Sequence, residues 1–215
     1  MSEGHSTVVS IEWQANESMQ TRKVGLWVFM GVMTSLFMLL MIAFIARTQL
    51  PDWQSLSEQP WGPFYDSWQL WLNTSILMAS SIALQWAWQA ARNGHTSASL
   101  LGFYLAGVFT VGFLLGQLMV WQALAKLGYI MQSNPANSFF YLLTAMHGLH
   151  LLGGLIVWGV ICVAYHQERS MQKLYENIAL CKTYWHFLLV LWLVLFALIT
   201  SSSDTYRAIA SMCGF

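Results

Sequence analysis

The chain has 215 residues, of which 57% are hydrophobic and only 8% are charged, and its formal net charge at pH 7 is zero. An average soluble domain carries about 25% charged residues, so this composition excludes a soluble globular protein and indicates an integral membrane protein. The zero net charge also argues against nucleic-acid binding, because that depends on an excess of basic side chains.

The chain opens with a polar segment, residues 1–23. The first apolar stretch after it is longer than the core of a signal peptide and lacks an A-x-A exit, so no cleaved signal is expected. We expect residues 1–23 to form a polar cytoplasmic tail and residues 24–215 to form one transmembrane domain.

Five stretches without Asp, Glu, Lys or Arg follow the tail. Each is long enough to cross about 30 Å of hydrocarbon as a helix of about 20 residues. They are continuous apolar runs without alternation, which excludes the strands of a membrane barrel. The predicted fold class is therefore all-α, an integral membrane bundle of five transmembrane helices. The five predicted spans cover about 24–46, 69–91, 98–125, 138–165 and 183–203.

Lysine and arginine predict the orientation, because both are enriched in cytoplasmic loops. With the N-terminus inside, the inner segments hold six of these residues and the outer segments hold three. The inner six are Arg22, Lys23, Arg92, Arg169, Lys173 and Lys182. We therefore expect a cytoplasmic N-terminus and a C-terminus on the outer face. Trp86 and Trp88 are expected at the inner interface, and Trp53, Trp61 and Trp68 of the loop 47–68 at the outer one.

The predicted spans contain three histidines of interest. His147 or His150 with His186 could bind a haem between facing helices. A bundle that carried haems and a redox copper would need about six histidine ligands, however, and only three are present. We interpret the three as structural side chains, hydrogen-bonded to backbone, hydroxyl or lipid headgroup. The cysteines Cys162, Cys181 and Cys213 are scattered, without metal-ligand spacing, and are expected to pack.

Small and polar residues indicate close helix packing. Gly112 and Gly116 form a GxxxG pair in the third span. Hydroxyl and amide side chains in the second and third spans are expected to bond between helices. These are Asn73, Thr74, Ser75, Ser80, Ser81 and Gln117. The absence of carboxylates and lysines from the spans argues against a self-sufficient transporter or channel.

Five blocks, in order, resemble the subunit III family of haem–copper oxidases, which includes cytochrome c oxidase subunit III. The most distinctive is FFYLLTAMHGLHLLGG (139–154), which is similar to the family segment F-x-x-x-T-x-x-H-G-x-H-x-x-x-G. The other four are GLWVF (25–29), LNTSILMASS (72–81), GQLMVW (116–121) and YWHFLLVLWLVLF (184–196). The blocks lie in all five predicted spans, and five helices are typical of many bacterial members.

The resemblance implies a non-catalytic accessory subunit of a proton-pumping terminal oxidase in a bacterial inner membrane. Such a subunit carries no haem or copper. It packs beside catalytic subunit I, binds phospholipid and supports sustained proton uptake. The resemblance also implies subunit II and small subunits as further partners. The residues that match packing and lipid-contact positions are Trp27, Asn73, Thr74, His147, His150, Trp185 and His186.

Two positions depart from the family pattern. Many members have a glutamate in W-x-F-x-x-x-E of the first span, where this chain has Met33, and an aspartate in W-H-F-x-D of the last span, where it has Leu189. A proton relay through those two acids therefore does not apply here. Three alternatives remain open: a quinol oxidase subunit, a nitric-oxide reductase accessory protein of the same fold, and a haem-binding anchor of a dehydrogenase.

Overall fold

The computed structural model describes residues 3–51, 53, 68–130, 134–168 and 171–213, and the side chains of all of these except 3–18, 168, 171, 212 and 213. The regular secondary structure of these segments is entirely α-helical. The helices are α1 (Glu3–Thr48), α2 (Trp68–Arg92), α3 (Thr96–Lys126), α4 (Pro135–Glu168), α5 (Met171–Thr200) and α6 (Ser203–Cys213). The prediction of an all-α membrane bundle is confirmed.

In the described part of the chain, four helical segments are long and apolar enough to cross a membrane: Met19–Thr48, Thr96–Lys126, Pro135–Gln167 and Gln172–Thr200. The predicted second span is also a helix, α2, but it is not among these four. Its apolar character is diluted by polar residues that are buried against other helices, including Asn73, Thr74, Ser80 and Ser81. A hydropathy criterion therefore underrates a helix that uses polar side chains for packing.

The helices extend beyond the apolar stretches that predict them. α1 begins at Glu3, within the predicted polar tail, and α5 begins at Met171, twelve residues before its predicted start. Polar residues stay helical once an adjoining apolar segment has nucleated the helix, whereas absence of charge marks only the apolar part. At its other end, α5 stops at Thr200, before the predicted limit of 203, and α6 follows from Ser203.

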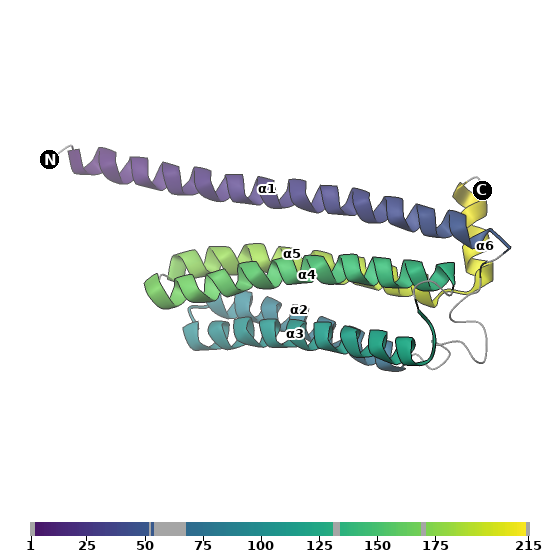
Figure 1. Cartoon of the computed structure of the whole chain (residues 1–215). Helices are drawn as coiled ribbons and strands as arrows, with labels where there is room; N and C mark the ends of the chain where they lie inside the picture. The colour runs from purple at the N-terminus through teal and green to yellow at the C-terminus, as the bar shows by residue number, and fades with distance from the viewer. Residues whose placement is uncertain (1–2, 52, 54–67, 131–133, 169–170, 214–215) are drawn as a thin grey trace. The chain divides into compact units, whose positions relative to one another are not determined.

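The chain divides into two compact units, residues 1–36 and residues 37–215. The first is the N-terminal part of α1. In the second, α2 packs against α3 and α5, and α4 packs against α5 and α3, so the four long helices run side by side (Figure 1). The core between them is built on large side chains with almost no exposed surface, among them Phe103, Phe113, Leu151, Trp185 and Trp192.

Two glycines end helices and turn the chain. Gly94 follows α2 with a φ of 77°, a left-handed conformation that glycine adopts without steric cost. The N–H of Gly94 donates to Ala91 O and that of His95 to Ala90 O, the two hydrogen bonds of a Schellman motif. Gly128, with a φ of 87°, closes α3 in the same way. The first of these turns joins α2 tightly to α3. Each of the two helices ends with a cation, Arg92 in α2 and Lys126 in α3, which interacts favourably with the free carbonyls of the last turn.

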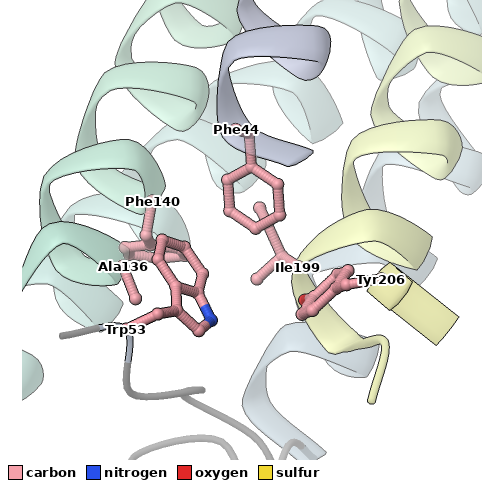
Figure 2. Close-up of a pocket in the computed structure, with 6 residues that line it drawn as sticks. All are labelled: Phe44, Trp53, Ala136, Phe140, Ile199 and Tyr206. Atoms are coloured by element: carbon pink, nitrogen blue, oxygen red, sulfur yellow. The ribbon is translucent and has the colours of Figure 1, made fainter. Parts of the chain in front are cut away.

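A small aromatic pocket lies at the end of the second unit where α4 begins and α5 ends. Its lining residues are Phe44, Trp53, Ala136, Phe140, Ile199 and Tyr206 (Figure 2). The Phe44 ring lies edge-on to Trp53, with centroids 5.1 Å apart, and Tyr206 OH donates to Leu198 O at 2.7 Å, which holds α6 against α5. Trp53 is therefore half-buried in this pocket. Trp68 is exposed, and Trp61 lies outside the described residues.

Candidate functional site

Two tryptophans of α5 donate hydrogen bonds to threonines of neighbouring helices. Trp185 Nε1 donates to Thr110 Oγ1 of α3 at 2.9 Å, and Trp192 Nε1 donates to Thr74 Oγ1 of α2 at 3.0 Å. Each threonine hydroxyl in turn donates to a carbonyl one turn earlier in its own helix. Ser80 of α2 joins the first pair, since its hydroxyl lies 2.8 Å from Thr110 Oγ1. Neutral, buried groups thus tie α5 to both α2 and α3.

A buried amide pair joins α2 to α3 on the same side of the core. Asn73 Nδ2 donates to Gln117 Oε1 at 3.2 Å, and both side chains are buried. The helices come close here because Gly116 has no side chain: a Cβ at this position would collide with Asn73 Oδ1. A Cβ at Gly112 would meet only Ile76, at an ordinary 3.7 Å. Gly116 is therefore the member of the predicted GxxxG pair that permits the close approach.

His147 is fully buried among aromatic rings. Its ring centroid lies 5.0 Å from that of Trp192 and 6.0 Å from that of Phe113. Neither ring nitrogen of His147 has a hydrogen-bond partner among the described residues. We predicted a structural histidine bonded to backbone, hydroxyl or lipid headgroup; the described residues offer no such bond to the His147 nitrogens, and the ring packs against aromatic rings instead.

His150 has different surroundings from His147, although the two lie on one helix. Three residues advance an α-helix by about 300°, and the remaining 60° turns His150 out of the core. Its Nδ1 donates to Met146 O at 2.7 Å, and its ring lies 5.7 Å from that of Phe37. Because a carbonyl only accepts, Nδ1 carries the proton. Tyr184 OH also donates to the His150 carbonyl at 3.0 Å, which ties α5 to α4.

The remaining two predicted site residues lie at the surface of their units. His186 of α5 is exposed, and its Nδ1 lies 3.1 Å from Ser81 Oγ of α2. Trp27 lies in the first unit, with 64% of its surface exposed. The structure thus brings together Asn73, Thr74, His147 and Trp185 around one core and places His150 and His186 at its edge. Trp27 belongs to the first unit.

Sequence reasoning missed two residues that organise the core. Trp192 contacts both His147 and Thr74, and Thr110 accepts the Trp185 hydrogen bond. A signal for Trp192 was present, because Trp185 and Trp192 are seven residues apart and therefore lie on one face of a helix. No comparable signal marks Thr110, since its role depends on a tryptophan 75 residues away in the sequence.

Candidate metal ligands do not gather in the described segments, where no three His, Cys, Asp or Glu side chains form a group that could hold a metal ion. Cys181 is buried, Cys162 is half-buried, and both are free thiols. The side chain of Cys213 lies outside the described residues. The polar groups of the core are therefore hydroxyls, amides, indoles and an imidazole, which suit helix packing and the binding of neutral polar atoms.

Comparison with known proteins identifies the family. The profile described as "Cytochrome c oxidase subunit III" matches residues 10–202. The chain belongs to the cytochrome c oxidase subunit III family. It is 28% identical to "Cytochrome c oxidase subunit 3" of Thermostichus vulcanus over 92% of this chain and 94% of that protein. A second protein of the same name, from Synechocystis sp., is 28% identical over 83% of this chain and 74% of its own length.

Another group of relatives aligns over a shorter region. "Probable cytochrome c oxidase subunit 3" of Mycobacterium tuberculosis is 30% identical over 59% of this chain, and the alignment covers 62% of that protein. The family profile, by contrast, includes every predicted site residue from Trp27 to His186. The packed core of α2 to α5 is therefore part of a cytochrome c oxidase subunit III fold.

Proposed function

We propose that this chain is a non-catalytic accessory subunit of a proton-pumping cytochrome c oxidase. In this role it stabilises catalytic subunit I, holds structural lipid and supports sustained proton uptake. The observation that carries the proposal is the family match over residues 10–202, nearly the whole chain. Its interior chemistry agrees with that role, because indole, hydroxyl and amide groups pair between helices and the predicted spans hold no Asp, Glu, Lys or Arg.

The cofactors would belong to other chains. Haems and copper are proposed in subunits I and II, with electrons passing from cytochrome c through subunit II. The supporting observation is chemical: the predicted spans hold three histidines and no carboxylate, and His186 and His150 already have hydrogen-bonded neighbours. His147 packs between aromatic rings of α3 and α5, an environment suited to a neutral imidazole.

The proposed partners are subunit I by direct contact, subunit II, small subunits and membrane phospholipid. The proposed location is the bacterial cytoplasmic membrane, with the N-terminus and residues 1–23 in the cytoplasm and the C-terminus in the periplasm. The bias of lysine and arginine toward the inner segments supports this orientation. Exposed apolar side chains on α3 and α4 suit lipid or a partner subunit; they include Val108, Met119, Leu149 and Ile156.

The electron donor is the point on which a second candidate differs. A quinol oxidase or a nitric-oxide reductase would use the same fold for this subunit, because the donor site lies on other chains. A gene for subunit II with a dinuclear copper motif beside the gene for this chain supports cytochrome c as donor. A neighbouring subunit II without that motif supports quinol.

A test of the proposal uses the histidines of α4. In the purified oxidase, His147→Leu or His150→Leu should make turnover decay faster over many cycles while the haem spectrum stays unchanged. His166→Leu is the matched control for His150→Leu, because His166 makes the same bond as His150 to a carbonyl one turn earlier but is exposed near the end of α4. An altered haem or copper spectrum in either core variant, or a Soret band in the chain alone, would contradict the proposal.

A further inference from the structure

Two cationic side chains from distant parts of the sequence share one tryptophan ring. Lys182 Nζ of α5 lies 3.6 Å from the centroid of the Trp88 ring, and Arg92 Cζ of α2 lies 5.0 Å from it. Trp88 and Lys182 are half-buried, and Arg92 is exposed. An aromatic face attracts each cation, but it carries no net charge, so the site keeps two positive charges close together.

No carboxylate neutralises this pair within the described residues. An ion pair in this part of the chain joins Arg207 and Asp204. Both residues lie in α6, which follows the C-terminal end of α5, whereas Lys182 lies in the N-terminal half of α5. The nearest acid along α5, Glu176, accepts a hydrogen bond from Gln172 at 3.1 Å. The neighbouring titratable group is His186, one turn beyond Lys182, which adds no negative charge. Two like charges held together without an anionic neighbour in the described segments form a site that an external anion would stabilise.

The position of the pair along the helices indicates which anion. Arg92 is the last residue of α2, and Lys182 immediately precedes the predicted apolar span 183–203. Arg92 therefore lies where α2 meets a polar turn, and Lys182 lies within α5 where its polar first part gives way to its apolar part. This is the depth at which tryptophan rings and phospholipid headgroups meet. A phosphate group at this depth would reach both cations.

An apolar row continues from the cations toward the middle of α5. Residues four apart share a helix face, which places Lys182, His186, Val190 and Val194 in one row. His186, Val190 and Val194 are all exposed. A ligand with an anionic head and an apolar tail would contact both the cations and the exposed valines, whereas a free inorganic anion would contact only the cations.

We propose that Arg92, Lys182 and Trp88 bind the phosphate of an anionic phospholipid, whose acyl chain lies along Val190 and Val194. The two cations contact the phosphate oxygens, and the indole packs against the headgroup. The site prefers phosphatidylglycerol to phosphatidylethanolamine, because the ammonium group of the latter would bring a third positive charge. This inference deepens the lipid-holding part of the proposed function and rests on it.

The test counts lipids on the intact complex that contains the full chain. Native mass spectrometry of that complex, titrated with phosphatidylglycerol, measures binding to this subunit. Each basic residue near an anionic headgroup contributes a roughly fivefold change in affinity, so Lys182→Gln or Arg92→Gln should weaken binding about fivefold and the double variant about thirtyfold. Lys126→Gln is the matched control, since Lys126 is an exposed cation at the end of α3 and should change nothing.

The remaining comparisons decide the source of the phosphate and guard against misfolding. Lys182→Arg keeps the charge and should keep the lipid. On the unsubstituted complex, phosphatidylglycerol should bind more tightly than phosphatidylethanolamine, and inorganic phosphate should not compete with it. Unchanged binding in the double variant, equal binding of the two lipids, or competition by inorganic phosphate overturns the proposal. If the co-purifying chains include no oxidase subunit, the proposed function fails while the lipid preference is still measurable.

Discussion

The core of the bundle and its cationic end handle polar groups in opposite ways. In the core, indole, hydroxyl and amide groups are neutral and bind one another, as in the Trp185–Thr110 and Trp192–Thr74 bonds. At the end where α2 finishes, Arg92 and Lys182 are charged and meet an aromatic face, without a carboxylate partner in the part of the chain that the structure describes. These paired polar groups of the core are thus satisfied within the bundle, and the ring nitrogens of His147, which have no partner among the described residues, are an exception. The cationic end depends on an anion from outside the chain.

The difference follows from the solvent at each depth. In hydrocarbon, an unpaired polar group costs several kcal/mol, which favours neutral groups that pair within the protein. At the headgroup level, water and lipid phosphates are available, and an unpaired cation there is tolerated and useful. Substitutions in the core should therefore change stability, and substitutions at the cationic end should change ligand binding.

The largest effect is expected from filling the gap at Gly116. Gly116→Ala places a Cβ against Asn73 Oδ1, so the amide must shift from its place beside Gln117, and overpacking of this kind costs about 1–3 kcal/mol. Gly112→Ala is the control on the same helix, since its Cβ has room and alanine favours helix by up to about 1 kcal/mol. The readout is the temperature at which the subunit dissociates from the purified complex. Equal shifts for both variants would contradict the assignment of the close contact to Gly116.

A smaller loss is expected when a core hydrogen bond is removed. Thr110→Val deletes the acceptor of Trp185 Nε1 and the neighbour of Ser80, which should destabilise the chain by about 1 kcal/mol. Ser75→Ala serves as control, because the exposed Ser75 hydroxyl bonds only to Trp71 O of its own helix. The same dissociation temperature measures both. A Thr110→Val variant as stable as Ser75→Ala would show that the indole bond contributes nothing.

A still smaller effect is expected from His147→Phe. The ring contacts with Trp192 and Phe113 are kept, and no hydrogen bond recorded in the structure is lost. Replacing a buried polar group that has no partner leaves no other group unsatisfied, so the free energy of unfolding should change by no more than about 0.5 kcal/mol. His147→Leu, by contrast, also loses the ring contacts. A large loss in the phenylalanine variant would show that the imidazole nitrogens bind a polar group.

The smallest change in stability is expected at the cationic end. In detergent without anionic lipid, Lys182→Gln should leave the dissociation temperature nearly unchanged, because loss of the attraction between the ammonium group and the Trp88 ring is offset by relief of its repulsion from Arg92. Added phosphatidylglycerol should then stabilise the unsubstituted subunit more than the variant, since a ligand stabilises the state that it binds. If the lipid stabilised the variant as much as the unsubstituted subunit, the cationic end would not be the region that binds an outside ligand.

Much of the fold was predictable because it depends on local patterns. Continuous uncharged stretches located the cores of α1 to α5, and Gly94 and Gly128 stand directly after two of the helices. The polar ends of α1 and α5 were not predicted as helix, because hydropathy reports the surroundings of a residue and not its backbone conformation. The same limit explains α2, whose buried Asn73 and Ser80 make it look less apolar than its neighbours.

The sequence by itself determined the all-α membrane class, the apolar part of each helix and, through the ordered motifs, the oxidase subunit III family. Only the tertiary structure decided that His147 packs in the core while His150 turns toward Phe37, and that Thr110 accepts the Trp185 bond. It also decided that Lys182 meets Arg92 over Trp88. Periodicity and hydropathy are properties of one helix, whereas the partner of a side chain depends on which helices pack together and on their relative rotation.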